Sequence, residues 1–465
     1  MNRLAKISQG ELLASGIFPG LIGEGAPLWS DGENITFEDG GVRKSHGLLG
    51  LADLSAIPTG AKSTVAEGEA RLYLGAGTSA YMYRSADVLT PIANLAAVGG
   101  AYQFIPWDTQ ALINNQVDPV QLWPNVGLAA PITAPFTRAK VLFKYQTQAF
   151  AANTSNGGQL VEWSSANSVT DWTPSLTNTA GNLRLRDLEG DIEAAVPIGG
   201  SVGIYGQKNA GLFSFIGGGA VTYGFRRPVP GISAINPYSV VGLGDRHYGL
   251  TKDRAFVTDM LSYQNIDEPA MRSYLLANAD WDRQAEVRGW HDWRNNRVRW
   301  AVPKISGGMF GLGYRVDARS WTRFDDGVIL GEEAGAFNNM FLLNNAKLLR
   351  EDPLSYDNDG SAMTAFVRTK PLDLGDRNRM KRITKLSLDM TWTGEVEIRL
   401  GYSNHLNDAV DWVVTAPAAN EIYPDSFGVQ SETAYLSVEI RATSVGATWK
   451  LAGGEIYGEV TGYVS

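Results

Sequence analysis

A short apolar strand, Arg71-Leu72-Tyr73-Leu74-Gly75, runs through a polar turn to a second strand, Tyr81-Met82-Tyr83. The same pattern returns further along the chain, in copies that begin at Ala111, Ala149, Val202, His247, Gly289 and Met340. The steps between successive starts are 40, 38, 53, 45, 42 and 51 residues. Each copy is typical of a β-hairpin, and propeller blades repeat at roughly 40–50 residues. The sequence therefore predicts a β-propeller over residues 62–352.

The segments on either side of this array lack the repeat. For residues 1–61 we expect an N-terminal arm or platform segment, in which Asn2 to Ala14 form a short helix or an extended arm. Residues 353–360 are polar and turn-rich, which indicates a boundary. Beyond it, residues 353–465 carry longer strands that alternate in polarity, as in Val396-Glu397-Ile398-Arg399-Leu400. Such alternation predicts a β-sandwich-like layer with one buried face and one solvent-exposed face.

The predicted fold class is therefore all-β. Ser273 to Glu286 is the best helical candidate in the chain, because several of its apolar residues recur at helical spacing.

Composition excludes several classes of protein. Across 465 residues there is no cysteine, which rules out a disulfide scaffold, a thiol nucleophile and cysteine-ligated metal, and fits assembly in a reducing cytosol. The net charge of −9 and the pI of about 5.2 do not indicate a general nucleic-acid binder. No stretch of 18 apolar residues exists, so no membrane span is expected. The basic start lacks an apolar region behind it, so we expect no secretory signal peptide.

Few residues are candidates for chemistry. The four histidines, His46, His247, His291 and His405, show no metal-ligand spacing. Asp357-Asn358-Asp359-Gly360 resembles the start of a calcium loop, but Arg368 stands where the closing glutamate belongs, so a tight turn is the better interpretation. Glu332 and Glu333 are the one adjacent glutamate pair, and neighbours in a strand point to opposite faces. We predict no catalytic, metal or cofactor site, and no enzyme.

Tryptophan is abundant, with 13 residues in the chain. Exposed rings could stack on sugars. However, Trp163, Trp290, Trp300 and Trp321 begin or end predicted strands, and core packing between blades is the favoured interpretation.

One segment concentrates positive charge. Between Arg368 and Lys385, seven basic residues stand against two acidic ones. The segment is either a solvated loop and strand face or a contact surface for an acidic partner or for DNA phosphates. We expect Arg377, Arg379, Lys381 and Arg382 to be its main contacts with an acidic surface of a partner subunit.

Several stretches together resemble the tail nozzle proteins of short-tailed bacteriophages, also called packaged-DNA stabilisation or tail accessory proteins. The resemblance is carried by residues 34–47, 238–250, 280–303 and 365–383, with Trp449-Lys450-Leu451-Ala452-Gly453 near the end. Two features depart from the family pattern. A single tryptophan, Trp300, stands in place of the usual pair, and the C-terminal end lacks a Gly-Arg-rich stretch.

This resemblance implies a structural virion protein of the viral tail without enzymatic chemistry. It implies a propeller protein that assembles in the host cytoplasm as a homohexameric ring below the head–tail adaptor, or connector. The ring would build and close the distal channel for double-stranded DNA until ejection, and a tail fibre, spike or needle protein would be a further partner. The alternative is a glycan-binding or glycan-cleaving propeller, which would be a monomer that binds a glycan array.

Overall fold

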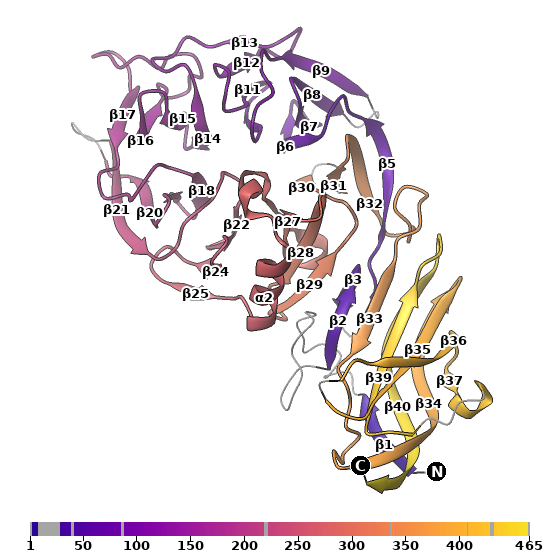
Figure 1. Ribbon diagram of the computed structural model, residues 1–465. Helices are drawn as coiled ribbons and strands as arrows, with labels where there is room; N and C mark the ends of the chain where they lie inside the picture. The colour runs from indigo at the N-terminus through magenta and orange to yellow at the C-terminus, as the bar shows by residue number, and fades with distance from the viewer. Residues whose placement is uncertain are drawn as a thin grey trace.

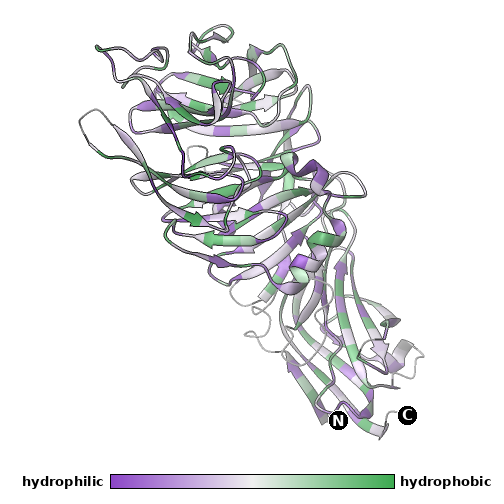
Figure 2. Cartoon of the chain, turned by 60° about the vertical axis from the view of Figure 1, so that its left-hand side comes forward, coloured by the Kyte–Doolittle hydropathy of each residue, from purple (hydrophilic) through white to green (hydrophobic). Residues whose placement is uncertain are grey.

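A computed structural model describes residues 2–7, 28–38, 41–84, 88–217, 222–334, 337, 339–406, 408–427 and 432–463. These residues are mostly β-strand and form two bodies, a ring of sheets and a smaller body of two layers that extends away from it (Figure 1). The predicted all-β fold class is confirmed. Figure 2, which views the chain from the side, shows that the two bodies together make an elongated molecule.

Seven antiparallel sheets of four strands form the ring within the described residues, and we number them as blades in chain order. Blade one contains β6 (Pro58–Ala66), β7 (Glu69–Ala76), β8 (Ser79–Arg84) and β9 (Leu89–Asn94). Blade two contains β10 (Gln103–Trp107), β11 (Gln110–Asn114), β12 (Gln121–Trp123) and β13 (Ala130–Pro131). Blade three contains β14 (Ala139–Tyr145), β15 (Gln148–Thr154), β16 (Gly157–Trp163) and β17 (Gly181–Arg184).

The later blades follow the same order. Blade four contains β18 (Ala194–Ile198), β19 (Ser201–Tyr205), β20 (Asn209–Phe215) and β21 (Tyr223–Pro230). Blade five contains β22 (Val240–Leu243), β23 (Arg246–Leu250), β24 (Ala255–Thr258) and β25 (Tyr263–Asn265). Blade six contains β26 (Arg288–Asp292), β27 (Arg297–Pro303), β28 (Met309–Arg315) and β29 (Ser320–Phe324).

Blade seven closes the ring with a strand from the start of the chain. It consists of β30 (Leu330–Ala334), β31 (Asn339–Asn344), β32 (Lys347–Asp352) and β5 (Gly47–Asp53). The first strands of successive blades contact one another from β6 around to β30, and β30 contacts β6 again. The described residues thus form a closed seven-bladed β-propeller. Closure also covers the edge that β32 would otherwise expose.

The predicted hairpins explain these blades. Six of the seven copies coincide with the second and third strands of a blade, such as β7 and β8. The copy at Gly289 covers the first and second strands instead, because β26 and β27 both carry the apolar and tryptophan pattern. The turns are equally local in origin. Between β6 and β7, Glu67 and Gly68 have φ values of 54° and 76°, as a two-residue turn that matches strand twist requires.

The smaller body is a β-sandwich. One sheet contains β1 (Asn2–Ile7), β3 (Ile35–Glu38), β4 (Gly41–Lys44), β34 (Arg379–Thr393), β37 (Glu421–Ile422), β38 (Glu432–Thr433) and β40 (Thr448–Tyr463). The other contains β2 (Trp29–Glu33), β33 (Ala365–Thr369), β35 (Val396–Ser403), β36 (Asp411–Pro417) and β39 (Tyr435–Ala442). Both sheets contribute to one core, as the predicted alternation requires: Val396, Ile398 and Leu400 are buried, while Glu397 and Arg399 are partly exposed.

The start of the chain differs from the expectation of a helix or arm. Residues 2–7 form β1, which pairs with the long strand β40, and residues 8–14 lie outside the described part. Strands β1 to β4 belong to the sandwich and β5 belongs to the propeller. Sequence periodicity within residues 1–61 could not show these assignments, because apart from the β3–β4 hairpin the partner strands lie hundreds of residues further on.

The predicted helix lies in the connection between blades five and six, but with other bounds. Helix α2 (Pro269–Asn278) begins earlier than expected, since proline suits the first turn of a helix. Ala279 is extended and ends the helix, and a 3₁₀-helix, η1 (Trp281–Glu286), follows. Two further 3₁₀-helices are η2 (Trp293–Asn295) and η4 (Pro424–Phe427).

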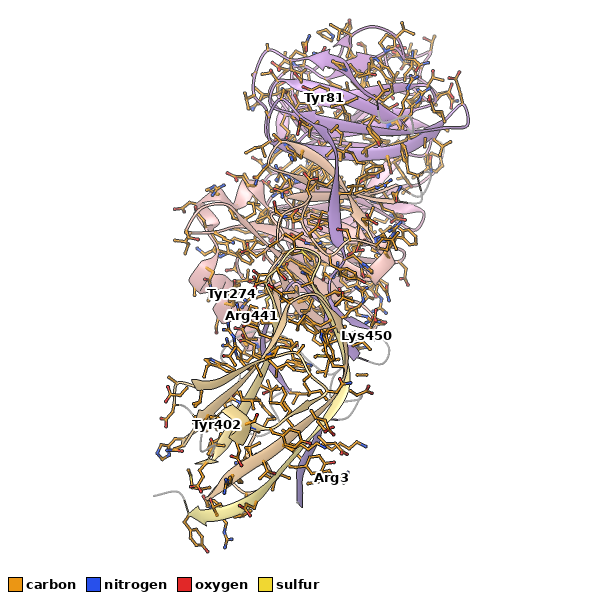
Figure 3. The ribbon with its side chains drawn as sticks, turned by 90° about the vertical axis from the view of Figure 1, so that its right-hand side faces the viewer. Arg3, Tyr81, Tyr274, Tyr402, Arg441 and Lys450 are labelled. Carbon is orange, nitrogen blue, oxygen red and sulfur yellow. The ribbon has the colours of Figure 1, made fainter. Side chains whose placement is uncertain are left out.

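The sandwich is attached to blade six by hydrogen bonds and ion pairs. The Asn34 backbone N–H donates to the Arg323 carbonyl (3.0 Å), and the Asn34 side-chain oxygen accepts from the Asp325 N–H (2.9 Å). The Arg323 guanidinium lies 3.1 Å from Asp31 and 3.4 Å from Glu33. Figure 3 shows Tyr274 of the propeller and Arg441 of the sandwich close to this junction, with Arg3 near the far tip.

Candidate functional site

The predicted basic surface lies on and before strand β34, and its arginines already have acidic partners. Arg377 lies 3.0 Å from Asp373, and Arg382 lies 3.1 Å from Asp425. Arg379 lies 3.8 Å from Asp376 and also stacks over the Tyr463 ring at 4.7 Å. All three arginines are partly exposed, so these pairs are screened by water and contribute little stability.

Lys381 does not belong to an accessible surface, which corrects its predicted role as a contact. Its side chain is 0% exposed, and its Nζ donates to the backbone carbonyls of Asp376 and Ala434. Burial lowers the pKa of this lysine. The alternation along β34 was the signal that could have found this, because Lys381 shares the inward face with Ile383.

The charge excess seen in the sequence is offset by acids from other parts of the chain. Asp425 pairs with Arg382, Glu421 pairs with Lys385, and the buried Glu439 pairs with Arg368. These three acids lie outside the Arg368–Lys385 segment. A local charge count could not include them, so it overstated the positive field of this surface.

The four histidines lie apart from one another. His247 sits between blades four and five, where its Nδ1 accepts from the Tyr205 hydroxyl (2.8 Å) and its Nε2–H donates to the Pro197 carbonyl (2.9 Å). His291 contacts Glu333, and His46 contacts the Pro353 carbonyl (3.1 Å). Among the described residues, no three His, Asp or Glu side chains gather where they could hold a metal ion.

The buried His247 predicts an acid-sensitive blade contact. Burial lowers the pKa of His247 to about 4, against about 6.5 in an unfolded chain. The unfolded chain therefore takes up this proton first, so stability falls as pH drops from 6.5 to 4 and is constant for this group outside that window. In His247→Gln, the acid-dependent loss of urea stability should shrink by roughly 3 kcal/mol. An unchanged pH profile in this variant would show that His247 is not the titrating group.

The adjacent glutamates of β30 contact different neighbouring blades. Glu332 Oε1 accepts from the Ser63 N–H (2.9 Å) and hydroxyl (3.0 Å) and lies 3.0 Å from the Lys62 ammonium, all on blade one. Glu333 lies 3.1 Å from His291 on blade six. The two carboxylates therefore tie blade seven to its two neighbours, and they do not converge on a common substrate position.

Side chains cross the middle of the propeller at one end of its axis. Tyr238 lies just before β22, the first strand of blade five, and Tyr102 lies just before β10, the first strand of blade two. The Tyr238 hydroxyl donates to the Tyr102 carbonyl, although blades two and five are not neighbours. Arg288 of blade six donates to the Thr59 carbonyl of blade one (3.2 Å) and stacks over Tyr238 at 5.6 Å. Burial lowers the pKa of Arg288 to about 10, but the residue stays charged at neutral pH. This end of the ring is therefore crossed by protein.

The remaining candidates have structural surroundings. Trp163, Trp290, Trp300 and Trp321 are 6%, 4%, 0% and 0% exposed, which confirms core packing for these tryptophans. The turn at residues 357–360 docks on blade seven, where Asp359 accepts from the Gly50 N–H (2.9 Å) and binds Lys347 (2.7 Å). No helix in the described part of the chain has the length and apolar character that a membrane crossing requires.

No protein-family model matches the chain, and no curated protein sequence matches it. Among solved structures, the chain is similar to the computationally designed protein Ika8, with 10% identity, 66% of this chain and 99% of that chain covered, and a TM-score of 0.41. It is also similar to the C-terminal WD40 domain of Sif2, with 12% identity, 66% and 99% coverage, and a TM-score of 0.37. The propeller assignment itself follows from the strand pairings described above.

Proposed function

We propose that this chain is a tail nozzle subunit of a short-tailed bacteriophage. In this role it is a structural virion protein that forms a ring below the head–tail adaptor and retains packaged DNA until ejection. The proposal is supported by the resemblance of residues 34–47, 238–250, 280–303 and 365–383 to that family. The observation that carries it is the junction at blade six, where hydrogen bonds and ion pairs hold the propeller to the sandwich. A ring subunit needs such a defined angle between its parts, because symmetric closure depends on it.

The DNA passage in this proposal lies between subunits, at the centre of the ring. Tyr238 and Arg288 cross the middle of the propeller, so a duplex could not follow the propeller axis. The net charge of −9 supports the same role, since a passage for ejection should not bind phosphates tightly.

The proposed partners are further copies of this chain, the adaptor and a fibre, spike or needle protein, in virions assembled in the host cytoplasm. Arg377, Arg379 and Arg382 remain proposed contacts with an acidic partner surface. Each would exchange an internal acid for an external one, so their role is to orient docking rather than to supply affinity. No enzymatic activity is proposed.

The proposal predicts ring assembly by the purified chain with its adaptor. Mass photometry and negative-stain images should show closed hexameric rings. Reversing Arg377, Arg379 and Arg382 to glutamate should slow assembly several-fold at low salt and leave the monomer folded, because steering by exposed charges is salt-dependent. Reversing Arg186, Arg283 and Arg319, three arginines of the propeller that are at least partly exposed, is the matched control and should have no effect. A monomer that forms no ring and binds a glycan array would favour the glycan-binding class instead.

A further inference from the structure

A cluster of buried charges fills the seam between blades six and seven. It consists of Asp292 at the end of β26, Arg297 and Arg299 of β27, Asp326 after β29, and Glu351 of β32. Their exposed fractions are 2%, 5%, 3%, 6% and 8% in that order. The seam lies where the chain passes between the two bodies, because β32 is the last strand of the propeller and pairs with β5, the strand that enters it.

Two of the three carboxyl groups are paired, and Glu351 is not. Asp292 lies 2.5 Å from Arg297, and Asp326 lies 2.7 Å from Arg299. Within the described residues Glu351 has no ion pair. Its one side-chain hydrogen bond is a long one from the Asn295 amide (3.4 Å). The same amide nitrogen lies 3.1 Å from each oxygen of Asp292, so Glu351 and Asp292 face a single shared donor.

The cluster therefore holds three acids against two guanidiniums, and the seam has little room for a compensating group. The space between these side chains is about 10 Å³, which admits nothing much larger than a water molecule. His46 lines the same space, but burial lowers the pKa of His46, which favours its neutral form. The described acids and histidines form no metal-binding group. An ionised Glu351 would thus be a buried charge without a partner, which is strongly unfavourable.

We propose that Glu351 holds a proton in the closed propeller, and that loss of this proton loosens the pairing of β5 with β32. The pairing of β5 with β32 is thereby sensitive to pH, at the point where the sandwich is attached to the propeller. Burial, and then the nearby charge of Asp292, raise the pKa of Glu351. Burial alone would also raise the pKa of Asp292, but Arg297 and Arg299 hold it below its usual value. The two carboxyl groups are thus pushed apart in acidity, with the proton on Glu351.

The other charged groups around Glu351 define the direction of the effect. Arg297, the Asn295 hydrogen bond and Arg294 each favour ionisation of Glu351, and Asp292 opposes it more strongly than any one of them. Arg299 forms an ion pair with Asp326, and His46 forms a hydrogen bond with the Pro353 carbonyl. Since the folded-state pKa of Glu351 lies above its unfolded value, this group's contribution to stability is complete below about pH 4.5. It is lost as pH rises through the folded-state pKa.

The test compares the full-length chain with Glu351→Gln, which mimics the protonated acid. In the wild type, hydrogen exchange of the β5 amides, corrected for intrinsic base catalysis, should accelerate about tenfold or more between pH 5 and 9. In Glu351→Gln this acceleration with rising pH should be absent. Glu459→Gln, an exposed change on β40, is the matched control and should behave as the wild type.

Two outcomes would overturn the proposal. One is a corrected β5 exchange rate in the wild type that does not change with pH. The other is an offset between wild type and Glu351→Gln that is the same at every pH, which would mark Glu351 as a packing residue only. Neither outcome depends on ring assembly, so the experiment tests this proposal independently of the proposed function.

Discussion

The Asp326→Asn variant is expected to be less stable than the wild type by about 3–5 kcal/mol, the cost typical of breaking a buried ion pair on one side. The substitution preserves the shape of the side chain but removes its charge. Arg299, 3% exposed and 2.7 Å away, would then be a buried cation that has lost the one carboxylate it contacts directly among the described residues. Its ring neighbours, Phe324 at 4.0 Å and Trp290 at 5.1 Å, cannot replace a carboxylate. Urea denaturation followed by tryptophan fluorescence measures the loss.

A double variant separates the pair from its surroundings. Asp326→Leu combined with Arg299→Met replaces both charges by apolar groups, and most of the lost stability should return, because the desolvation of both ions is then avoided. Glu286→Gln breaks the exposed pair with Arg283 and should cost less than about 1 kcal/mol. A loss of similar size in Asp326→Asn and Glu286→Gln would contradict the importance of burial in the seam.

Deleting residues 1–53 is expected to abolish the folded state of the whole chain. The deletion removes β5, which leaves the β32 edge of blade seven open. It also removes β1 to β4, which supply Trp29, Ile35, Phe37 and Val42 to the sandwich core. Full burial of one large apolar side chain contributes about 1.5–3 kcal/mol, so the loss of these four, about 6–12 kcal/mol together, is comparable to the whole net stability of a domain. Size-exclusion chromatography should show aggregate and no monomer.

A cut in the connecting segment is the matched control. A protease site placed at residues 353–361 severs β32 from β33 but leaves every strand present. The C-terminal fragment should stay bound, because β40 pairs with β1 and β4 and β33 pairs with β2, and those strands remain joined to the propeller. Separation of the two fragments without denaturant would show that the N-terminal strands do not hold the sandwich together.

The parts of the fold that are local in sequence could be predicted, and the parts that depend on distant partners could not. The hairpin at Arg71 carries its own strands and turn, so it is visible without the rest of the chain. The alternation of Val396 to Leu400 likewise shows its buried face. The outer strand of blade seven was missed because Gly47–Asp53 has no hairpin partner nearby; its partner is β32.

The same distinction applies to the candidate site. Residues 368–385 are basic as a string of letters, yet Asp425, Glu421 and Glu439 bring acids to them across the sandwich. The seam at Glu351 gave no sequence signal, because its five charged residues come from four separate segments of the chain. By contrast, the inward position of Lys381 was predictable from the period-two pattern of β34.

The distance along the chain between β1 or β5 and its partner strand has a consequence for how the protein is made. Asn2 pairs with Gly458, and Asp53 pairs with Lys347, so β1 and β5 leave the ribosome long before their partner strands are synthesised. At roughly 5–20 residues per second, synthesis of the chain takes on the order of a minute, during which these strand edges stay open. Contacts so distant in sequence also make folding slow. Chaperone supply and translation rate should therefore control the yield of soluble chain more strongly than the stability of the finished fold.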